Sequence, residues 1–108
     1  MKEKLKRQYC YVFLTCEKEQ EKEIAKLLLT KRLVACVKFM PVNASFWWQG
    51  AIANGDETLL VMESAEDLFE TIEAEVAKVH AYETFVLTCV PMKKINRQAQ
   101  EWLEGELT

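Results

Sequence analysis

The sequence has few of the residues that interrupt regular structure, with three glycines and two prolines among 108 residues. No linker rich in these residues and no internal repeat divides it, so we predict one domain over residues 9–108 after a flexible tail over residues 1–8. Long apolar runs are also missing. The stretch from Tyr9 to Leu14 is far shorter than the roughly 20 residues of a membrane-spanning helix, and no signal-peptide cleavage pattern follows it. We therefore expect a cytoplasmic protein.

An excess of positive charge is missing as well. The formal net charge is -3 and the isoelectric point is near 5.3. A nucleic-acid-binding domain normally presents a basic face, and docking on anionic lipids also depends on basic residues. We therefore expect neither nucleic acid nor a membrane as a partner.

Histidine is almost absent, since His80 is the only one in the chain. The sequence shows no Ser-His-Asp set, no Cys-His pair with a recognisable spacing and no glycine-rich phosphate loop. With one histidine, acid–base catalysis would depend on carboxylates, and no pair of them is singled out by its position. The chain is predicted not to be an enzyme.

The four cysteines do not form a C-x-x-C motif of the kind found in zinc and redox sites. All of them lie in or beside apolar runs, where a free cysteine behaves as a small hydrophobic residue. We expect reduced, mostly buried thiols at Cys10, Cys16, Cys36 and Cys89.

Half of the residues are apolar, and their spacing predicts alternating strands and helices. Strands are predicted over residues 9–16, 34–40, 45–53, 59–62 and 84–90. Helices are predicted over residues 17–31, over residues 64–79 with Ser64 as the N-cap, and in a final segment that begins near Asn96. This order predicts an α+β fold of the ferredoxin-like (split β-α-β) type, with an extended central β-hairpin and a C-terminal helix.

Three short features predict how the strands connect. Asn54-Gly55 readily adopts positive φ values, which predicts a type I′ hairpin turn at this dipeptide. Pro41 has no N–H to donate, which predicts a bend, a bulge or an edge position. A helix between the first two strands predicts that they form a parallel pair.

The predicted strands are apolar on both faces, whereas helices cover only one face of such a sheet. Over residues 9–16 one face carries Tyr9, Tyr11, Phe13 and Thr15, and residues 34–40 are apolar on both sides except at Lys38. An exposed apolar face of several strands exceeds what monomers usually present to water. Self-association explains this pattern best, and the alternative is that the final helix and the long hairpin fold back over the face.

Several segments, taken together and in this order, resemble the CutA divalent-cation tolerance family. They are Thr15-Cys16 at the end of the first strand, LVACVKFMP over 33–41, SFWWQG over 45–50, HAYET over 80–84 and Trp102-Leu103. The resemblance implies a ferredoxin-like fold and a tight homotrimer in which the sheets face inward. It also implies a role in tolerance of divalent metals, copper above all, with metal ions bound in clefts between subunits.

The resemblance also implies site residues. By their positions in the matching segments, Cys36, His80 and Glu83 are the expected ligands for copper or another divalent metal, and Trp48 and Tyr82 are expected at the cleft or interface. The chain departs from the family's usual residues at Lys38, Glu63, Ala81, Phe85 and Val86. We include Lys38 and Glu63 among the cleft residues, with the hypothesis that they form an ion pair across neighbouring strands.

Simpler interpretations remain open for the expected ligands. A single histidine at a helix end often bonds the last carbonyl groups, and Cys36 is equally suited to fill a core. Lys38 also supports another function, a trimeric regulator of the signal-transducer type that binds a small anionic ligand. A trimeric scaffold for other proteins is the third possibility.

Overall fold

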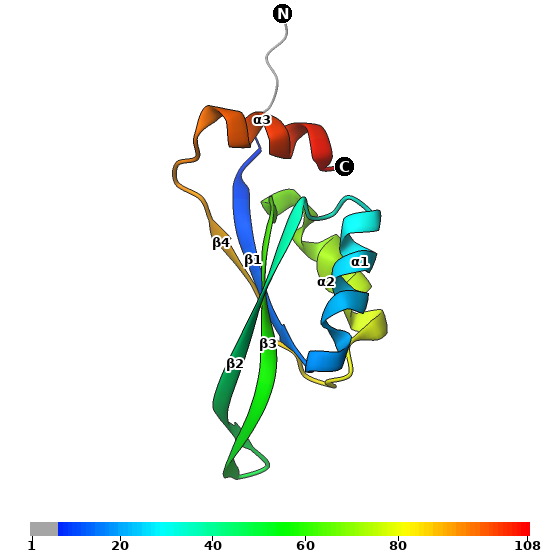
Figure 1. The fold of residues 1–108 in the computed structure, drawn as a ribbon, viewed down its shortest axis with the longest axis vertical. Coiled ribbons are helices and arrows are strands. Elements are labelled where there is room, and N and C mark those ends of the chain that lie inside the picture. Colours follow the sequence, from blue (N-terminus) through cyan, green and yellow to red (C-terminus); the bar gives the residue numbers. More distant parts are fainter. Residues whose placement is uncertain (1–6) are drawn as a thin grey trace, which may run out of the picture.

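A four-stranded sheet forms the centre of the structure, a computed structural model that describes residues 7–108 (Figure 1). Its strands are β1 (Tyr9–Cys16), β2 (Cys36–Trp48), β3 (Ala51–Ala65) and β4 (Leu87–Pro91), in the spatial order β2-β3-β1-β4. The helices are α1 (Glu21–Thr30), α2 (Phe69–Val79) and α3 (Arg97–Glu106), and the short 3-10 segments Lys18–Gln20 and Glu66–Leu68 precede α1 and α2. The predicted α+β class and ferredoxin-like element order are confirmed.

The N-terminal segment is described only from Arg7 onward. The Arg7 guanidinium pairs with the Asp67 carboxylate at 2.8 Å, and the Gln8 side-chain amide donates to the Met92 carbonyl at 2.9 Å. These contacts tie the start of β1 to the segments that follow β3 and β4. Of the flexible tail predicted over residues 1–8, positions 1–6 lie outside the described residues.

The predicted parallel pair of first and second strands is wrong in one respect. β1 and β2 run in the same direction, as two strands joined by a helix should, but β3 lies between them. Each ladder among the described residues is therefore antiparallel. A helical crossover fixes the relative direction of two strands and leaves room for a third strand between them.

The hairpin turn predicted at Asn54-Gly55 lies elsewhere. Trp48 pairs with Ala51, and the two residues between them, Gln49 and Gly50, have φ values of 51° and 82°, as a type I′ turn requires. Residues 54 and 55 instead lie inside β3. The observed register sets the apolar strand over 36–40 against the equally apolar 59–63, whereas a turn at 54–55 would set it against the segment that forms α2. Long-range pairing therefore overrides the local turn preference.

Pro41 and Ser64 both lie within strands. β2 continues through Pro41, which is tolerated because β2 is an edge strand, one of the three positions predicted for it. Ser64 does not cap a helix. It is buried on β3, where its hydroxyl donates to the Leu33 carbonyl at 2.7 Å.

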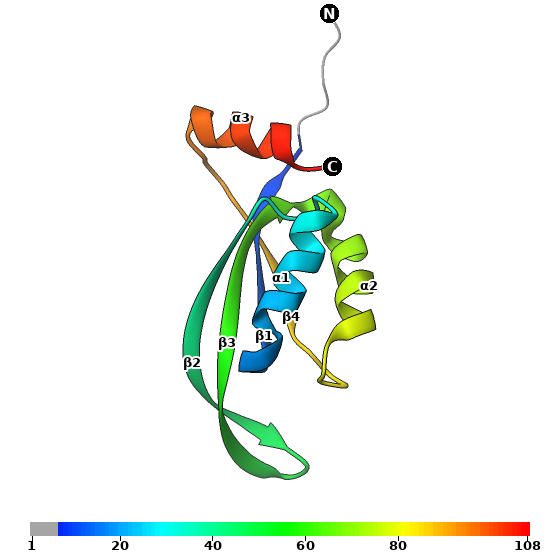
Figure 2. The same cartoon turned by 45° about the vertical axis from the view of Figure 1, so that its right-hand side comes forward.

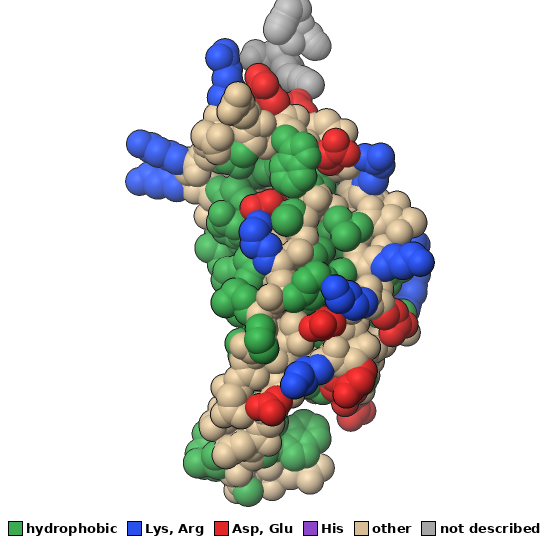
Figure 3. Space-filling model, in the orientation of Figure 1, with side chains coloured by type: hydrophobic (Ala, Val, Ile, Leu, Met, Phe, Trp, Pro, Cys, Tyr) green, Lys and Arg blue, Asp and Glu red, His purple; other side chains and the backbone are tan. Residues whose placement is uncertain are grey.

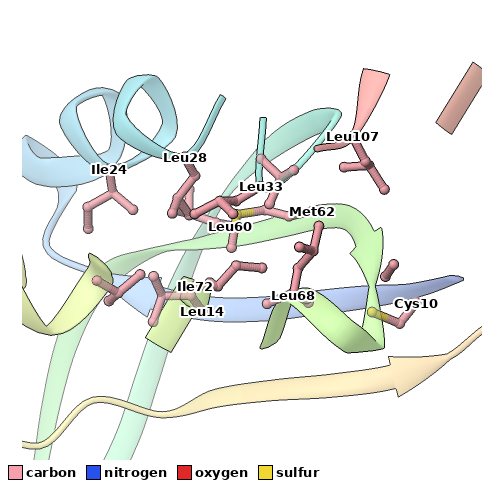
Figure 4. Packing of buried hydrophobic residues seen from close by; sticks show 14 of the residues in the cluster. Cys10, Leu14, Ile24, Leu28, Leu33, Leu60, Met62, Leu68, Ile72 and Leu107 are labelled. Carbon is pink, nitrogen blue, oxygen red and sulfur yellow. The ribbon is translucent and has the colours of Figure 1, made fainter. Parts of the chain in front are cut away.

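One face of the sheet is covered by α1 and α2 (Figure 2). Alternate side chains of β1 and β3 point into this layer, where they meet the apolar stripes of the two helices. The side chains that are at most 1% exposed here include Cys10, Val12, Leu14, Leu60 and Met62 from the strands and Ile24, Leu28, Ile72 and Val76 from the helices, several of them labelled in Figure 4.

The opposite face of the sheet has no covering layer. Strand register places on it Tyr11, Phe13, Thr15, Cys36, Lys38, Met40, Leu59, Val61, Glu63, Thr88 and Val90, which we call the open face. Helix α3 lies across one end of the sheet, and the β2–β3 hairpin projects beyond the other end (Figures 1 and 2). Within the described part of the chain, α3 therefore lies only over the end of the open face, and the hairpin leaves the rest of it uncovered.

Candidate functional site

The open face carries a cluster of three functional groups on β2 and β3. Cys36 lies opposite Glu63 in the β2–β3 ladder, and Lys38 lies two residues further along the same face. The Lys38 ammonium is 3.4 Å from the Glu63 carboxylate and 3.5 Å from the Cys36 sulfur. The hypothesised Lys38–Glu63 ion pair is therefore present.

Electrostatics at this cluster favour a charged Lys38. Partial burial lowers the pKa of the Lys38 ammonium, but the Glu63 carboxylate and the Cys36 thiol outweigh burial, so this pKa lies above its ordinary value. A permanent cation beside Cys36 repels a second cation and attracts an anion. The cluster can bind a metal at Cys36 only if Lys38 turns away or further anionic ligands arrive.

A pocket of about 560 Å³ opens beside the cluster, between the open face and α3. Its lining includes Tyr11 and Glu63 from the sheet, Lys93 and Lys94 from the segment after β4, and Trp102 from α3. Tyr11 is 38% exposed and Trp102 is 42% exposed, so both aromatic residues of the lining are partly accessible to solvent. The sequence reasoning missed this pocket, because α3 reaches the start of β1 only through the tertiary fold.

His80 lies at the other end of β1. Its Nε2 is 2.9 Å from the Thr15 carbonyl oxygen, and its Nδ1 accepts the Tyr82 backbone N–H at 3.0 Å. These bonds assign the neutral ring with the proton on Nε2. The ring also stacks on Phe85, with centroids 5.0 Å apart. His80 therefore fixes the segment over 80–86 against β1, and its ring bonds a strand carbonyl rather than the carbonyls at the end of α2.

Tyr82 fastens the same segment to β3. Its hydroxyl donates to the Glu57 carboxylate at 2.5 Å. Burial and this carboxylate both raise the pKa of Tyr82, so the phenol stays protonated and continues to donate. Glu83 is exposed beside it.

The hairpin tip gathers exposed aromatic side chains. Trp48 is 53% exposed, Trp47 is 74% exposed and Ile52 is 66% exposed, next to the turn at Gln49-Gly50. Figure 3 shows hydrophobic side chains gathered at this tip and again over the strands on the left of the view. Exposed tryptophans at the end of a projecting hairpin are typical of a contact surface.

The expected metal ligands are not brought together within one subunit. Cys36 shares a row of the sheet with Tyr11, whereas His80 bonds Thr15, which is about 13 Å further along β1 at roughly 3.3 Å per residue. Within residues 7–108, no three or more His, Cys, Asp and Glu side chains converge as a metal site would require. The described side chains therefore do not form a complete ligand set for Cys36 or His80.

No helix in the described part of the chain has the length and apolar character needed to cross a bilayer.

Comparisons with known proteins cover nearly the whole chain. The family model described as CutA1 divalent ion tolerance protein matches residues 10–106. The divalent-cation tolerance protein CutA of Archaeoglobus fulgidus is 30% identical over 95 residues, which span 87% of this chain and 93% of that protein. The human protein CutA is 31% identical over 93 residues, which span 84% of this chain and 52% of that protein.

Solved structures agree with the sequence match. The periplasmic divalent cation tolerance protein CutA from Archaeoglobus fulgidus gives a TM-score of 0.88 at 27% identity, over 91% of this chain and 97% of that one. CutA1 from Oryza sativa gives a TM-score of 0.90 at 27% identity, over 94% of this chain and 95% of that one. The range of the family-model match, residues 10–106, includes all three helices and nearly all of the sheet.

Proposed function

Because the chain belongs to the CutA1 divalent ion tolerance family, we propose that it is a homotrimer that binds copper or another divalent metal in the clefts between its subunits. The observation that carries this proposal is the open face. On it Tyr11, Met40 and Val90 are 38%, 47% and 43% exposed in the single chain, although all three are large, mostly apolar side chains.

Assembly is the favourable way to cover this face. Burying about 1,000 Å² of apolar surface gives roughly 25 kcal/mol before the costs of association and ordering are subtracted. Closed rotational symmetry lets each copy offer one surface and receive another without leaving an open end. The aromatic hairpin tip and the open face are two such surfaces.

The clefts of such a trimer are where we propose that metal ions bind. Cys36, His80 and Glu83 are the proposed ligands, with Trp48 and Tyr82 beside them, and the shared cleft supplies the ligands that one chain keeps apart. Copper and zinc usually take three or four side-chain ligands. For His80 to bind through Nδ1, it must release the Tyr82 N–H. Metal binding is therefore coupled to movement of the segment over 80–86.

We further propose that the protein acts by binding rather than by catalysis and that it works in the cytoplasm. On the open face the Lys38 ammonium is engaged by the Glu63 carboxylate in an ion pair and also donates to the Cys36 sulfur, which supports a binding role for this cluster. The four cysteines are free thiols, which supports a reducing compartment.

The metal proposal is tested by titrating the reduced, assembled protein with Cu(I), Cu(II) and Zn(II) in competition with chelators. Cys36→Ser and His80→Ala are expected to weaken binding by at least about tenfold, as the loss of a direct ligand should. Cys16→Ser, which changes a buried thiol on the helix-covered face, is the matched control and should bind normally. Binding that is absent, or unchanged by both site variants, contradicts the proposal.

The pocket beside α3 favours a second candidate function, the binding of a small anion with an aromatic or apolar part. Lys93 and Lys94 line the pocket together with Trp102. A thermal-shift screen with inorganic phosphate and nucleotides tests it, since a ligand of the folded state raises Tm. A rise in Tm that Trp102→Ala or Lys94→Met abolishes, in protein that does not respond to metals, favours the anion function. A trimer that responds to neither class of ligand is a scaffold.

A further inference from the structure

Two cysteines outside the open face lie next to each other between β1 and β4. In the ladder Cys10 pairs with Pro91 and Val12 pairs with Cys89, so the two cysteines are diagonal neighbours on the helix-covered face. Cys10 is fully buried and is one of the cluster residues labelled in Figure 4, and Cys89 is partly exposed. The two thiols are close enough that Cys89 contributes to the raised pKa of Cys10.

The geometry of this pair suits a bridging atom better than a disulfide. Diagonal neighbours in an antiparallel ladder have Cα atoms about 7–8 Å apart, at or beyond the roughly 7 Å limit for a disulfide, whose S–S bond is about 2.0 Å. Both cysteines are free thiols. Two metal–sulfur bonds in line span about twice 2.3 Å, so a cation between the sulfurs fits without drawing the strands together.

The surroundings also favour a cation. Burial is the main cause of the raised pKa of Cys10, followed by Cys89, and the negative charges of Glu66 and Asp67 contribute as well. The Asp67 charge is offset by the Arg7 guanidinium, which pairs with it at 2.8 Å. The Glu66 carboxylate adds a small negative potential, which disfavours a bare thiolate and favours a bound cation at the same position.

The number of ligands selects the kind of cation. No cluster of three or more His, Cys, Asp and Glu side chains occurs in the described part of the chain, so this pair has two sulfur ligands of its own. Zinc normally takes four ligands and calcium six to eight, and neither is satisfied here. Soft thiolates select copper in its reduced, monovalent state.

We propose that Cys10 and Cys89 form a two-sulfur site for a soft monovalent cation, Cu(I), separate from the metal clefts between subunits. Each sulfur that binds as a thiolate releases its proton to solvent, and copper enters and stays as Cu(I), so no electron is transferred. Entry is through β4, an edge strand of five residues that presents the partly exposed Cys89. This proposal rests on the proposed metal function only for the identity of the cation.

The test separates this pair from the cleft by working in a Cys36→Ser background. The protein is titrated anaerobically with Cu(I) against a chromophoric chelator, and the bound copper is examined by X-ray absorption. We expect Cys36→Ser to keep a Cu(I) per chain with two sulfur ligands. Cys36→Ser/Cys89→Ser should lose it, whereas the control Cys36→Ser/Cys16→Ser should keep it.

A measurement on the unmodified protein gives a result that does not depend on whether the variants fold. Bound Cu(I) should protect Cys89 from alkylation while Cys36 and Cys89 are followed separately by peptide mass. Three results would overturn the two-sulfur site. They are copper that Cys36→Ser/Cys89→Ser retains, an equal loss of copper in the Cys16 control, and bound copper without two sulfur ligands. Loss of all Cu(I) in Cys36→Ser alone also overturns it and leaves the cleft proposal standing. If the cleft does not bind metal but the Cys10–Cys89 pair still holds Cu(I), only the cleft proposal is rejected.

Discussion

The Lys38 ammonium lies 3.4 Å from the Glu63 carboxylate, across the β2–β3 ladder, and 3.5 Å from the Cys36 sulfur on its own strand. Lys38 is one of the positions at which the sequence was found to depart from the family's usual residues. An exposed ion pair contributes little to stability. Its main effect is therefore on what can bind next to Cys36.

Removing this cation should strengthen metal binding. Lys38→Met eliminates the charge that repels a divalent ion and leaves Glu63 free to approach the metal. An exposed charge pair contributes up to about 1 kcal/mol, so we expect up to about fivefold tighter Zn(II) binding, measured by competition titration. Lys26→Met, on the exposed side of α1, is the control and should leave affinity unchanged. Weaker binding in Lys38→Met would show that Lys38 helps to hold the ligand, as in the anion function.

Truncating His80 should loosen the segment that follows α2. His80→Ala removes the bonds to the Thr15 carbonyl and the Tyr82 N–H and the stacking on Phe85. Loss of partly buried hydrogen bonds costs about 1–3 kcal/mol, which denaturant unfolding measures at constant chain concentration. Hydrogen exchange at the Tyr82 amide should become faster. The neighbouring exposed Glu83→Ala should change stability by less than about 0.5 kcal/mol; an equal loss in both variants would mean that the ring bonds are not responsible.

The Arg7–Asp67 pair should make stability depend on acid pH. The hydrogen-bonded Arg7 guanidinium lowers the pKa of Asp67 below its unfolded value, despite an opposing effect of burial. Its contribution is therefore present above the unfolded value of about 3.9 and is lost as pH falls through the lower, folded value. Because Asp67 is 56% exposed, the contribution is at most about 1 kcal/mol.

The comparison that tests this pair is Asp67→Asn against the unmodified chain. The variant should be less stable at pH 7, and the difference in unfolding free energy should shrink toward zero as pH falls below the unfolded pKa and through the lower, folded one. A difference that stays constant across this range would assign the effect to something other than the ionised carboxylate. Asp56→Asn, a change at an exposed carboxylate near the hairpin tip, provides a control.

The two hairpin glycines offer a matched test of the observed turn. Gly50 has a φ of 82°, so Gly50→Ala forces an L-residue into the left-handed region and should cost about 1 kcal/mol. Gly55 lies inside β3 without a positive φ, and a Cβ there meets nothing within 4 Å. Gly55→Ala should be neutral or stabilising. The reverse order of effects in denaturant unfolding would place the turn at Asn54-Gly55 after all.

The sequence was sufficient for features that depend on neighbouring segments. The strand over 9–16 was predicted with its observed bounds, because its Tyr, Val, Phe and Thr residues favour a strand. The Lys38–Glu63 pair followed from placing two strands side by side. The hairpin turn was misplaced because Asn54-Gly55 is the stronger local signal, whereas the match between whole strands decides the register.

The features that sequence reasoning missed depend on distant parts of the chain. The pocket needs α3 to cross the end of the sheet near Tyr11, and in the sequence Trp102 of that helix contributed only to the family resemblance. The Cys10–Cys89 pair depends on the register of β1 with β4, which no local pattern specifies. The cleft ligands Cys36 and His80 remain a prediction, since a single subunit holds them apart.

The covering of the open face by other copies of the chain is tested most directly by the mass of the native particle in solution. Light scattering across a dilution series is expected to give three times the 12.6 kDa chain mass, and this value should persist to low concentration. A folded, soluble particle with the mass of one chain would show that Tyr11, Met40 and Val90 tolerate water, and the shared metal clefts would then have no place to form.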